Sequence, residues 1–218
     1  MPIAPLEPAS FKRGPGGRPS RAEAERRHHN LLAAATRLFL EKGWDGASVD
    51  EIARESGVAK RFIYARYPDK AALFAGTFER FIEEQIGTLR ILEPLPEDVE
   101  EGLCALGRRL LDLALRPEVL VFHRLFIAVS PRFPRLAKLF LERNRHRPLS
   151  EVIRVLAVYA DRGMIEFGDP EFLAEQFFIL VAGASQRLAL LGGREEPLQE
   201  DRRLEAAVRL FLNGCRKA

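Results

Sequence analysis

Apolar residues recur along most of the chain at spacings of three and four residues, which is typical of amphipathic helices. The first such stripe runs from Leu31 to Phe39, on a segment that begins after Ser20 and ends near Gly43. Glu23 stands three residues after Ser20, the spacing of a helix-capping box. Further helical stripes, divided by glycines and prolines, cover residues 48–57, 59–67, 69–86, 103–113, 119–126, 136–140, 152–159, 169–192 and 198–212. Because no segment alternates as a strand does, the pattern predicts an all-α protein of about nine helices.

The segment from Ser48 to Tyr67 has the spacing of a helix-turn-helix unit. Two short helices joined by a tight turn need a small residue where they approach, a residue that tolerates positive φ, and apolar residues on the facing sides. These requirements are met, in that order, by Ala53, by Gly57, and by Ile52, Val58 and Ile63. The unit is too small to be stable alone, so we expect the preceding helix to cover it.

The second short helix carries the candidate DNA-binding residues. In a helix-turn-helix protein this helix enters the major groove by its N-terminal part, where Lys60 and Arg61 stand here, with Arg66 at the far end. A plain helical hairpin with solvated basic residues would show the same spacing. The distribution of charge favours DNA: the chain has a net charge of +3, but residues 1–80 hold fourteen Lys or Arg against ten acids, and the remainder has a small acidic excess.

The stretch from Arg27 to Leu73 resembles the DNA-binding domain of TetR-family transcriptional regulators. The family's positions are held here by Leu38-Phe39, Gly43-Trp44, Ser48, Ile52-Ala53, Gly57-Val58, Tyr64, Lys70 and Leu73. Two places depart from the family pattern: Arg66-Tyr67 stand where His-Phe is usual, and Lys60-Arg61-Phe62 are bulkier than the small residues common there. An Arg at position 66 can meet a phosphate, and a solvated or intramolecular role is the alternative for it.

This resemblance implies a homodimer in which each recognition helix reads one half of a palindromic double-stranded DNA site. It assigns Lys60 and Arg61 to base edges or nearby phosphates, and the Tyr64 hydroxyl to a phosphate, with half-buried packing as the alternative for Tyr64. Ser48 and Lys70 stand at the N-terminal ends of two helices, where backbone amides and the helix dipole favour an anion, so we expect both to clamp the DNA backbone.

The chain divides into three parts on this interpretation. Residues 1–19 contain scattered prolines, glycines and basic residues and are expected to be a flexible basic arm, in which Arg18 is placed to enter a minor groove. Residues 20–68 form the helix-turn-helix domain. Residues 69–218 form a larger helical-bundle domain for ligand binding and dimerisation, which is similar to the regulatory domain of the same family.

The helix expected from Asp169 is apolar nearly all round, so it should be buried on one side by its own domain and on the other by a partner subunit. A central core helix in a monomer is the alternative. With the last helix it would form the family's four-helix dimer bundle, and the expected interface residues are Phe177, Leu180, Gly183, Ala184, Leu204, Val208 and Phe211.

A ligand pocket is expected inside the regulatory bundle, as the resemblance implies. Its candidate lining residues are mostly apolar and would suit a lipophilic or aromatic effector: Phe81, Phe122, His123, Phe126, Phe140, Gln176 and Ile179. Each aromatic residue at helical spacing also fits an ordinary core role. Effector binding would move the helix at 69–86 and release the DNA, which describes a repressor; an activator is the alternative.

Composition excludes several other classes. No segment resembles a secretory signal or a membrane span, and Cys104 and Cys215 are too few for a disulfide framework, so we expect a cytoplasmic protein. Whether either thiol has a redox role is open. A helical-bundle enzyme or carrier is the alternative of a different class, but the sequence has no Gly-rich phosphate loop, serine elbow or metal-ligand spacing, so no catalytic residue, metal or cofactor is expected.

Overall fold

The computed structural model describes residues 20–87, 94–134, 138, 149–166 and 168–215, and every regular element within these ranges is helical. The all-α expectation is therefore confirmed. The elements are α1 (Arg21–Gly46), α2 (Val49–Ser56), α3 (Lys60–Tyr64), α4 (Lys70–Gly87), α5 (Val99–Ala114), α6 (Pro117–Val129), the 3₁₀ turn η1 (Ser130–Arg132), α8 (Ser150–Asp161), α9 (Pro170–Phe178), the π-helical turn η3 (Ile179–Gly183), α10 (Ala184–Leu190) and α11 (Pro197–Cys215).

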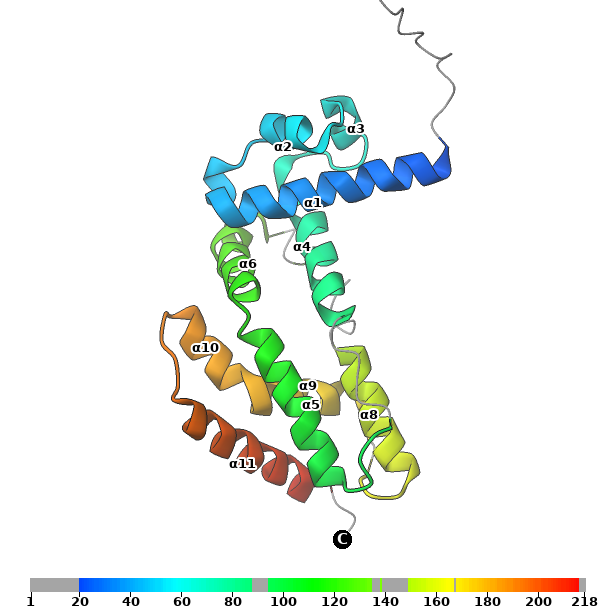
Figure 1. Cartoon of the computed structure of the whole chain (residues 1–218), viewed down its shortest axis with the longest axis vertical. Helices are drawn as coiled ribbons and strands as arrows, with labels where there is room; N and C mark the ends of the chain where they lie inside the picture. The colour runs from blue at the N-terminus through cyan, green and yellow to red at the C-terminus, as the bar shows by residue number, and fades with distance from the viewer. Residues whose placement is uncertain (1–19, 88–93, 135–137, 139–148, 167, 216–218) are drawn as a thin grey trace, which may run out of the picture.

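The molecule is elongated, with its first three helices at one end (Figure 1). Helix α1 lies across this end with α2 and α3 on its outer side, and α4 and α6 lead away from it toward α5, α8, α9, α10 and α11. None of the described helices is long and apolar enough to cross a membrane. The expected Arg18 and Phe140 sites and the stripe at 136–140 lie outside the described residues, except for Lys138 within that stripe.

The core at the N-terminal end is shared between α1, α2, α3, α4 and α6. Phe39 of α1 meets Phe74 of α4 edge to face at 4.9 Å between ring centroids, and Phe122 of α6 stacks on Phe78 of α4 at 5.4 Å. Such aromatic pairs add to the area they bury. Hydrophobic packing is thus continuous across the expected boundary at residue 68.

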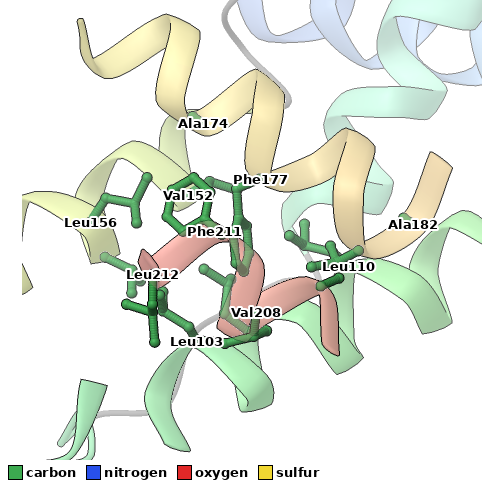
Figure 2. Packing of buried hydrophobic residues seen from close by; sticks show 14 of the residues in the cluster. Leu103, Leu110, Val152, Leu156, Ala174, Phe177, Ala182, Val208, Phe211 and Leu212 are labelled. Atoms are coloured by element: carbon green, nitrogen blue, oxygen red, sulfur yellow. The ribbon is translucent and has the colours of Figure 1, made fainter. Parts of the chain in front are cut away.

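A second core joins α5, α8, α9, η3 and α11, and Figure 2 shows its side chains converging between these helices. The rings of Phe177 and Phe211 cross at 70° with their centroids 5.1 Å apart. Helix α5 approaches α8 at Gly102, where an added Cβ would lie 1.7 Å from the Tyr159 hydroxyl oxygen. That hydroxyl donates a hydrogen bond to the Pro96 carbonyl at 3.1 Å.

The long helix expected from Asp169 begins as predicted, but its middle departs from a regular α-helix. The Asp169 carboxylate accepts hydrogen bonds from the backbone N–H groups of Glu171 and Phe172, which caps α9. The turn Ile179–Gly183 is π-helical, and no local signal in the sequence predicts it. Within the protomer the helix is covered on one side only: Ala174 and Phe177 are buried, whereas Phe172 and Ile179 are exposed.

Candidate nucleic-acid interface and regulatory domain

The helix-turn-helix unit is built by local capping and by three buried apolar residues. Gly57 adopts φ 68° and ψ 19°, which ends α2 in the left-handed conformation that glycine tolerates best. Val58 donates its backbone N–H to the Ala53 carbonyl at 3.1 Å and closes the turn. Because Ile52 and Ile63 are both fully buried against α1 and α4, α3 is held at a fixed angle on the surface.

The outer face of α3 presents Lys60, Arg61 and Tyr64 to solvent, as expected for a recognition helix. Tyr64 is 49% exposed. The Lys60 ammonium lies 2.5 Å from a carboxylate oxygen of Asp50. By contrast, Arg61 forms no ion pair with any residue that the structure describes. Arg61 can therefore contact DNA without first breaking an ion pair, whereas Lys60 has to leave Asp50.

The N-terminus of α2 carries more negative charge than a phosphate-binding helix end usually does. The Ser48 hydroxyl, which is exposed, accepts the Glu51 backbone N–H at 3.1 Å, and Asp50 and Glu51 both lie in the first turn. The Lys42 ammonium, 2.6 Å from Glu51, lowers the pKa of that carboxyl through a hydrogen bond. A phosphate at this end would have to approach two carboxylates, each of which already has a cation.

Lys70 is placed differently from the expectation of a phosphate clamp. Its ammonium donates a hydrogen bond to the Trp44 carbonyl and lies 4.6 Å from the centroid of the Trp44 ring. Burial lowers the pKa of Lys70. The kink at Gly43, with φ 69°, turns Trp44 toward α4. In this conformation Lys70 therefore makes an intramolecular contact between α4 and the end of α1.

Arg66 and Tyr67 also make contacts within the protein. The Arg66 guanidinium lies 3.9 Å above the centroid of the Phe62 ring, which is the intramolecular alternative considered for it. The Tyr67 hydroxyl lies 2.8 Å from Nε2 of His28 in α1. In the sequence, the only signal of this pair is the unusual tyrosine at position 67.

The aromatic residues expected in an effector pocket are mostly core residues of the N-terminal end. Phe81 and Phe122 are buried with their ring centroids 4.7 Å apart, and Phe126 stacks on Phe78 at 4.8 Å. His123 is half-buried, and burial lowers the pKa of its imidazole.

Gln176 belongs to α9, and Ile179, which is exposed, is the first residue of η3. None of these expected lining residues belongs to the lining of the cavity beside α6.

A cavity of about 340 Å³ lies instead between α6, α10 and the connection to α11. It is lined by Leu115, Pro117, Leu120, Val121, Arg124, Ser185, Ala189, Gly192, Gly193, Arg194, Glu195 and Glu200. Arg124 is occupied, because its guanidinium donates to the carbonyls of Ala189 and Leu190 at 2.6 and 2.8 Å. Glu195 and Glu200 are paired with Arg203 and Arg108. Arg194 is the lining cation with no ion pair to a described residue.

The end of α6 opposite this cavity contacts the DNA-binding end of the molecule. Arg132, in the 3₁₀ turn after α6, lies 3.2 Å from Asp45, and the Phe133 ring lies 5.3 Å from the Trp44 ring. Helix α6 therefore connects the cavity to the end of α1.

Comparisons with known proteins match both ends of the chain. A family model described as "Bacterial regulatory proteins, tetR family" matches residues 31–77. A second, described as "AefR-like transcriptional repressor, C-terminal domain", matches residues 101–214, more than half of the chain. The chain belongs to the TetR family. The resemblance of its helix-turn-helix residues to this family is therefore confirmed. The general function is confirmed as well: the chain is a sequence-specific DNA-binding transcriptional regulator.

Two curated relatives of this TetR-family chain differ in how much of it they match. The HTH-type transcriptional repressor SCO4008 of Streptomyces coelicolor is 31% identical over 157 residues, which cover 71% of this chain and 74% of that protein. The HTH-type transcriptional activator FasR of Mycolicibacterium smegmatis is 32% identical over 81 residues, only 36% of this chain and 37% of that protein.

Solved structures match most of the architecture. A regulator from Mesorhizobium loti MAFF303099 has a TM-score of 0.70 and 29% identity, and covers 91% of this chain and 100% of that chain. The Flavonoid-responsive Regulator FrrA has a TM-score of 0.65 and 31% identity, and covers 88% of this chain and 98% of that chain.

The surface of this TetR-family chain that is available to a partner subunit differs from the expected interface. Phe177, Leu204, Val208 and Phe211 are buried in the protomer's own core, because these faces of α9 and α11 pack against α5 and α8. They can add almost no area to an interface. Leu180, Gly183 and Ala184 are half-buried. The exposed large apolar residues between Pro170 and Cys215 are Phe172, Ile179, Leu191, Leu198 and Leu210.

Proposed function

We propose that this TetR-family chain is a cytoplasmic homodimeric repressor that binds palindromic operator DNA and is released by a small, largely apolar effector. The observation that carries the proposal is the exposed face of α3, where Lys60, Arg61 and Tyr64 project from a unit that the buried Ile52 and Ile63 fix to the core. The repressor named among its relatives and the repressor description of its C-terminal family model support this direction of regulation.

Arg61 is the residue best placed to read bases. It stands on the first turn of α3, the part of a recognition helix that reaches base edges. A guanidinium group can form a bidentate pair of hydrogen bonds with guanine. We assign Lys60 to a base edge or phosphate after it leaves its ion pair with Asp50, and the Tyr64 hydroxyl to a phosphate.

Dimerisation would place two recognition helices on successive turns of one DNA face. Such half-sites are separated by roughly 34 Å or a multiple of it, and a palindromic operator mirrors the two-fold axis of the protein. We place the dimer surface on the outward faces of α9, α10 and α11, where Phe172, Ile179 and Leu210 are exposed.

The cavity beside α6 is the proposed effector site. Its lining is largely apolar, with Arg194 as an anchor for a phenolate or carboxylate group. FrrA responds to flavonoids by its name, which makes a flavonoid a suitable first probe. Because the other end of α6 contacts α1 through Arg132 and Asp45, a ligand that displaces α6 would favour a different position of the DNA-binding end.

Selection of bound duplexes from a random DNA pool tests the DNA-binding part of this proposal. We expect a palindromic consensus with the full chain. Arg61→Ala should then weaken binding to that consensus by about 1–3 kcal/mol and relax preference at one position in each half-site. Arg154→Ala, on α8 at the other end of the molecule, removes the same charge and should leave binding unchanged (Figure 1). No enrichment, or equal losses from both variants, would contradict it.

The effector part is tested by adding quercetin, as the flavonoid probe, or benzoate, as the carboxylate probe, to the operator complex. We expect at least one of them to release DNA. Val121→Trp, which fills the cavity, should abolish release and keep operator affinity, because Val121 lies away from α3. Release that persists unchanged in this variant would place the effector elsewhere.

Activation of transcription is the second candidate, because one relative is named an activator. A reporter gene placed behind the selected operator distinguishes the two: expression that falls when the protein is present indicates repression, and expression that rises indicates activation.

A further inference from the structure

The side chain of Tyr67 is enclosed by two helices that do not touch DNA directly in the proposed arrangement. Its hydroxyl lies 2.8 Å from Nε2 of His28 in α1, and the two rings stack at 21° with centroids 6.0 Å apart. On the other side the ring lies against Gly76 of α4: a Cβ added there would meet Tyr67 Cε1 at 2.5 Å and its hydroxyl oxygen at 2.9 Å. Gly76 thus forms the notch that admits the ring.

The backbone of Tyr67 is tied to the recognition helix. Its N–H donates to the carbonyl of Ile63, the buried residue of α3, at 2.9 Å. The following Pro68 restricts the backbone of Tyr67 to extended conformations. A displacement of the Tyr67 side chain is therefore passed to the end of α3 within one helical turn.

The partner atom on His28 belongs to a neutral ring at pH 7. Burial, followed by the positive charges of Arg66 and Arg80, lowers the pKa of His28. Burial raises the pKa of Tyr67, so its hydroxyl stays protonated. The two groups can therefore form one hydrogen bond in which both partners are neutral.

We propose that Tyr67, held between His28 of α1 and Gly76 of α4, is a positioning residue for sequence reading: it sets the angle at which α3 presents its side chains to DNA without touching DNA itself. The inference rests on the proposed DNA-binding function. It adds a route by which a shift of α4 along α1 changes base recognition, since the ring cannot stay in its notch and keep its bond to His28 if the two helices slide.

The test measures affinity for the selected operator and for a random duplex with the full chain. Tyr67→Phe and His28→Ala should each weaken operator binding about three- to tenfold, the effect of one lost hydrogen bond, and leave random-duplex binding within about twofold. The double variant should lose no more than the stronger single variant, because the two residues act as one unit. Gly76→Ala should weaken operator binding in the same direction by displacing the ring.

Two controls separate positioning from stability and from general surface effects. Tyr159→Phe removes a buried hydroxyl bonded to Pro96 in the other core, and His29→Ala removes the exposed neighbour of His28; neither should change operator affinity. Thermal unfolding is measured for every variant.

Three results would overturn the inference: unchanged operator affinity in Tyr67→Phe, equal losses on operator and random DNA, or additive losses in the double variant. Wild-type protein without any sequence preference would overturn the proposed function as well, so the two failures are distinguishable.

Discussion

Lys60 and Arg61 are neighbours on the first turn of α3, yet they differ in what they contact. Lys60 is paired with Asp50 at 2.5 Å, whereas Arg61 has no ion pair within the described ranges. Exposed ion pairs contribute little to stability, so this pairing matters more for the availability of the cation than for folding. The two residues should therefore respond differently to removal of a nearby acid.

Asp50→Asn should strengthen DNA binding. The substitution frees Lys60 and removes a negative charge that repels phosphate, so we expect about a three- to tenfold gain on operator and random DNA at low salt, shrinking as salt rises. Titrations by fluorescence anisotropy at two salt concentrations measure it. Asp112→Asn, an exposed acid of α5, makes the same change in net charge; an equal gain there would show that the Lys60 pair is irrelevant.

His123 gives the stability of the protein a dependence on pH. Because burial lowers the pKa of this imidazole in the folded chain, the unfolded chain binds its proton first as pH falls. Stability should be complete above the ordinary histidine pKa of about 6.5 and decline as pH drops below it. Thermal unfolding between pH 7.5 and 5.5 checks this. His123→Leu should reduce the decline, and an unchanged decline would assign it to other groups, such as His28.

At the scale of elements, local capping was predictable and tertiary contacts were not. Ser48, Gly57 and Asp169 stand at helix ends as expected, since a cap is decided by residues within four positions of it. The direction of the Lys70 ammonium depends on how Gly43 turns Trp44, 26 residues away in sequence. Which face of α11 is buried likewise depends on α5 and α8, so periodicity placed Phe211 on an apolar stripe without saying what covers it.

The contact between α5 and α8 gives a packing prediction. Gly102→Ala should destabilise the protein by about 1–3 kcal/mol, because the new Cβ would overlap the Tyr159 hydroxyl. Gly214→Ala makes the same change in α11, where a Cβ meets no atom within 4 Å, and should be neutral or stabilising by up to about 1 kcal/mol. Denaturant unfolding of both variants measures the difference, and equal effects would contradict the packing at Gly102.

For the whole molecule, the proposed two-fold assembly depends on apolar residues left exposed on one side. Ile179→Glu should shift the protein from dimer to monomer and weaken operator binding, because a buried unpaired carboxylate is costly at an interface. Sedimentation equilibrium measures the change. Ile127→Glu on α6 is the control, since Ile127 is 51% exposed and Ile179 is 49% exposed. A dimer that survives Ile179→Glu would move the interface to another face.

The shared core at the N-terminal end limits how this regulator can be recombined. Phe39 and Trp44 of the first helix rest on Phe74 of α4, and Phe122 of α6 packs against the same ring. In a chimera joined after Pro68, these rings would face side chains of another protein that are not complementary to them in shape. The helix-turn-helix domain therefore cannot be transferred alone to another regulatory domain. A functional chimera has to keep α4 and the inner face of α6 together with the helix-turn-helix domain.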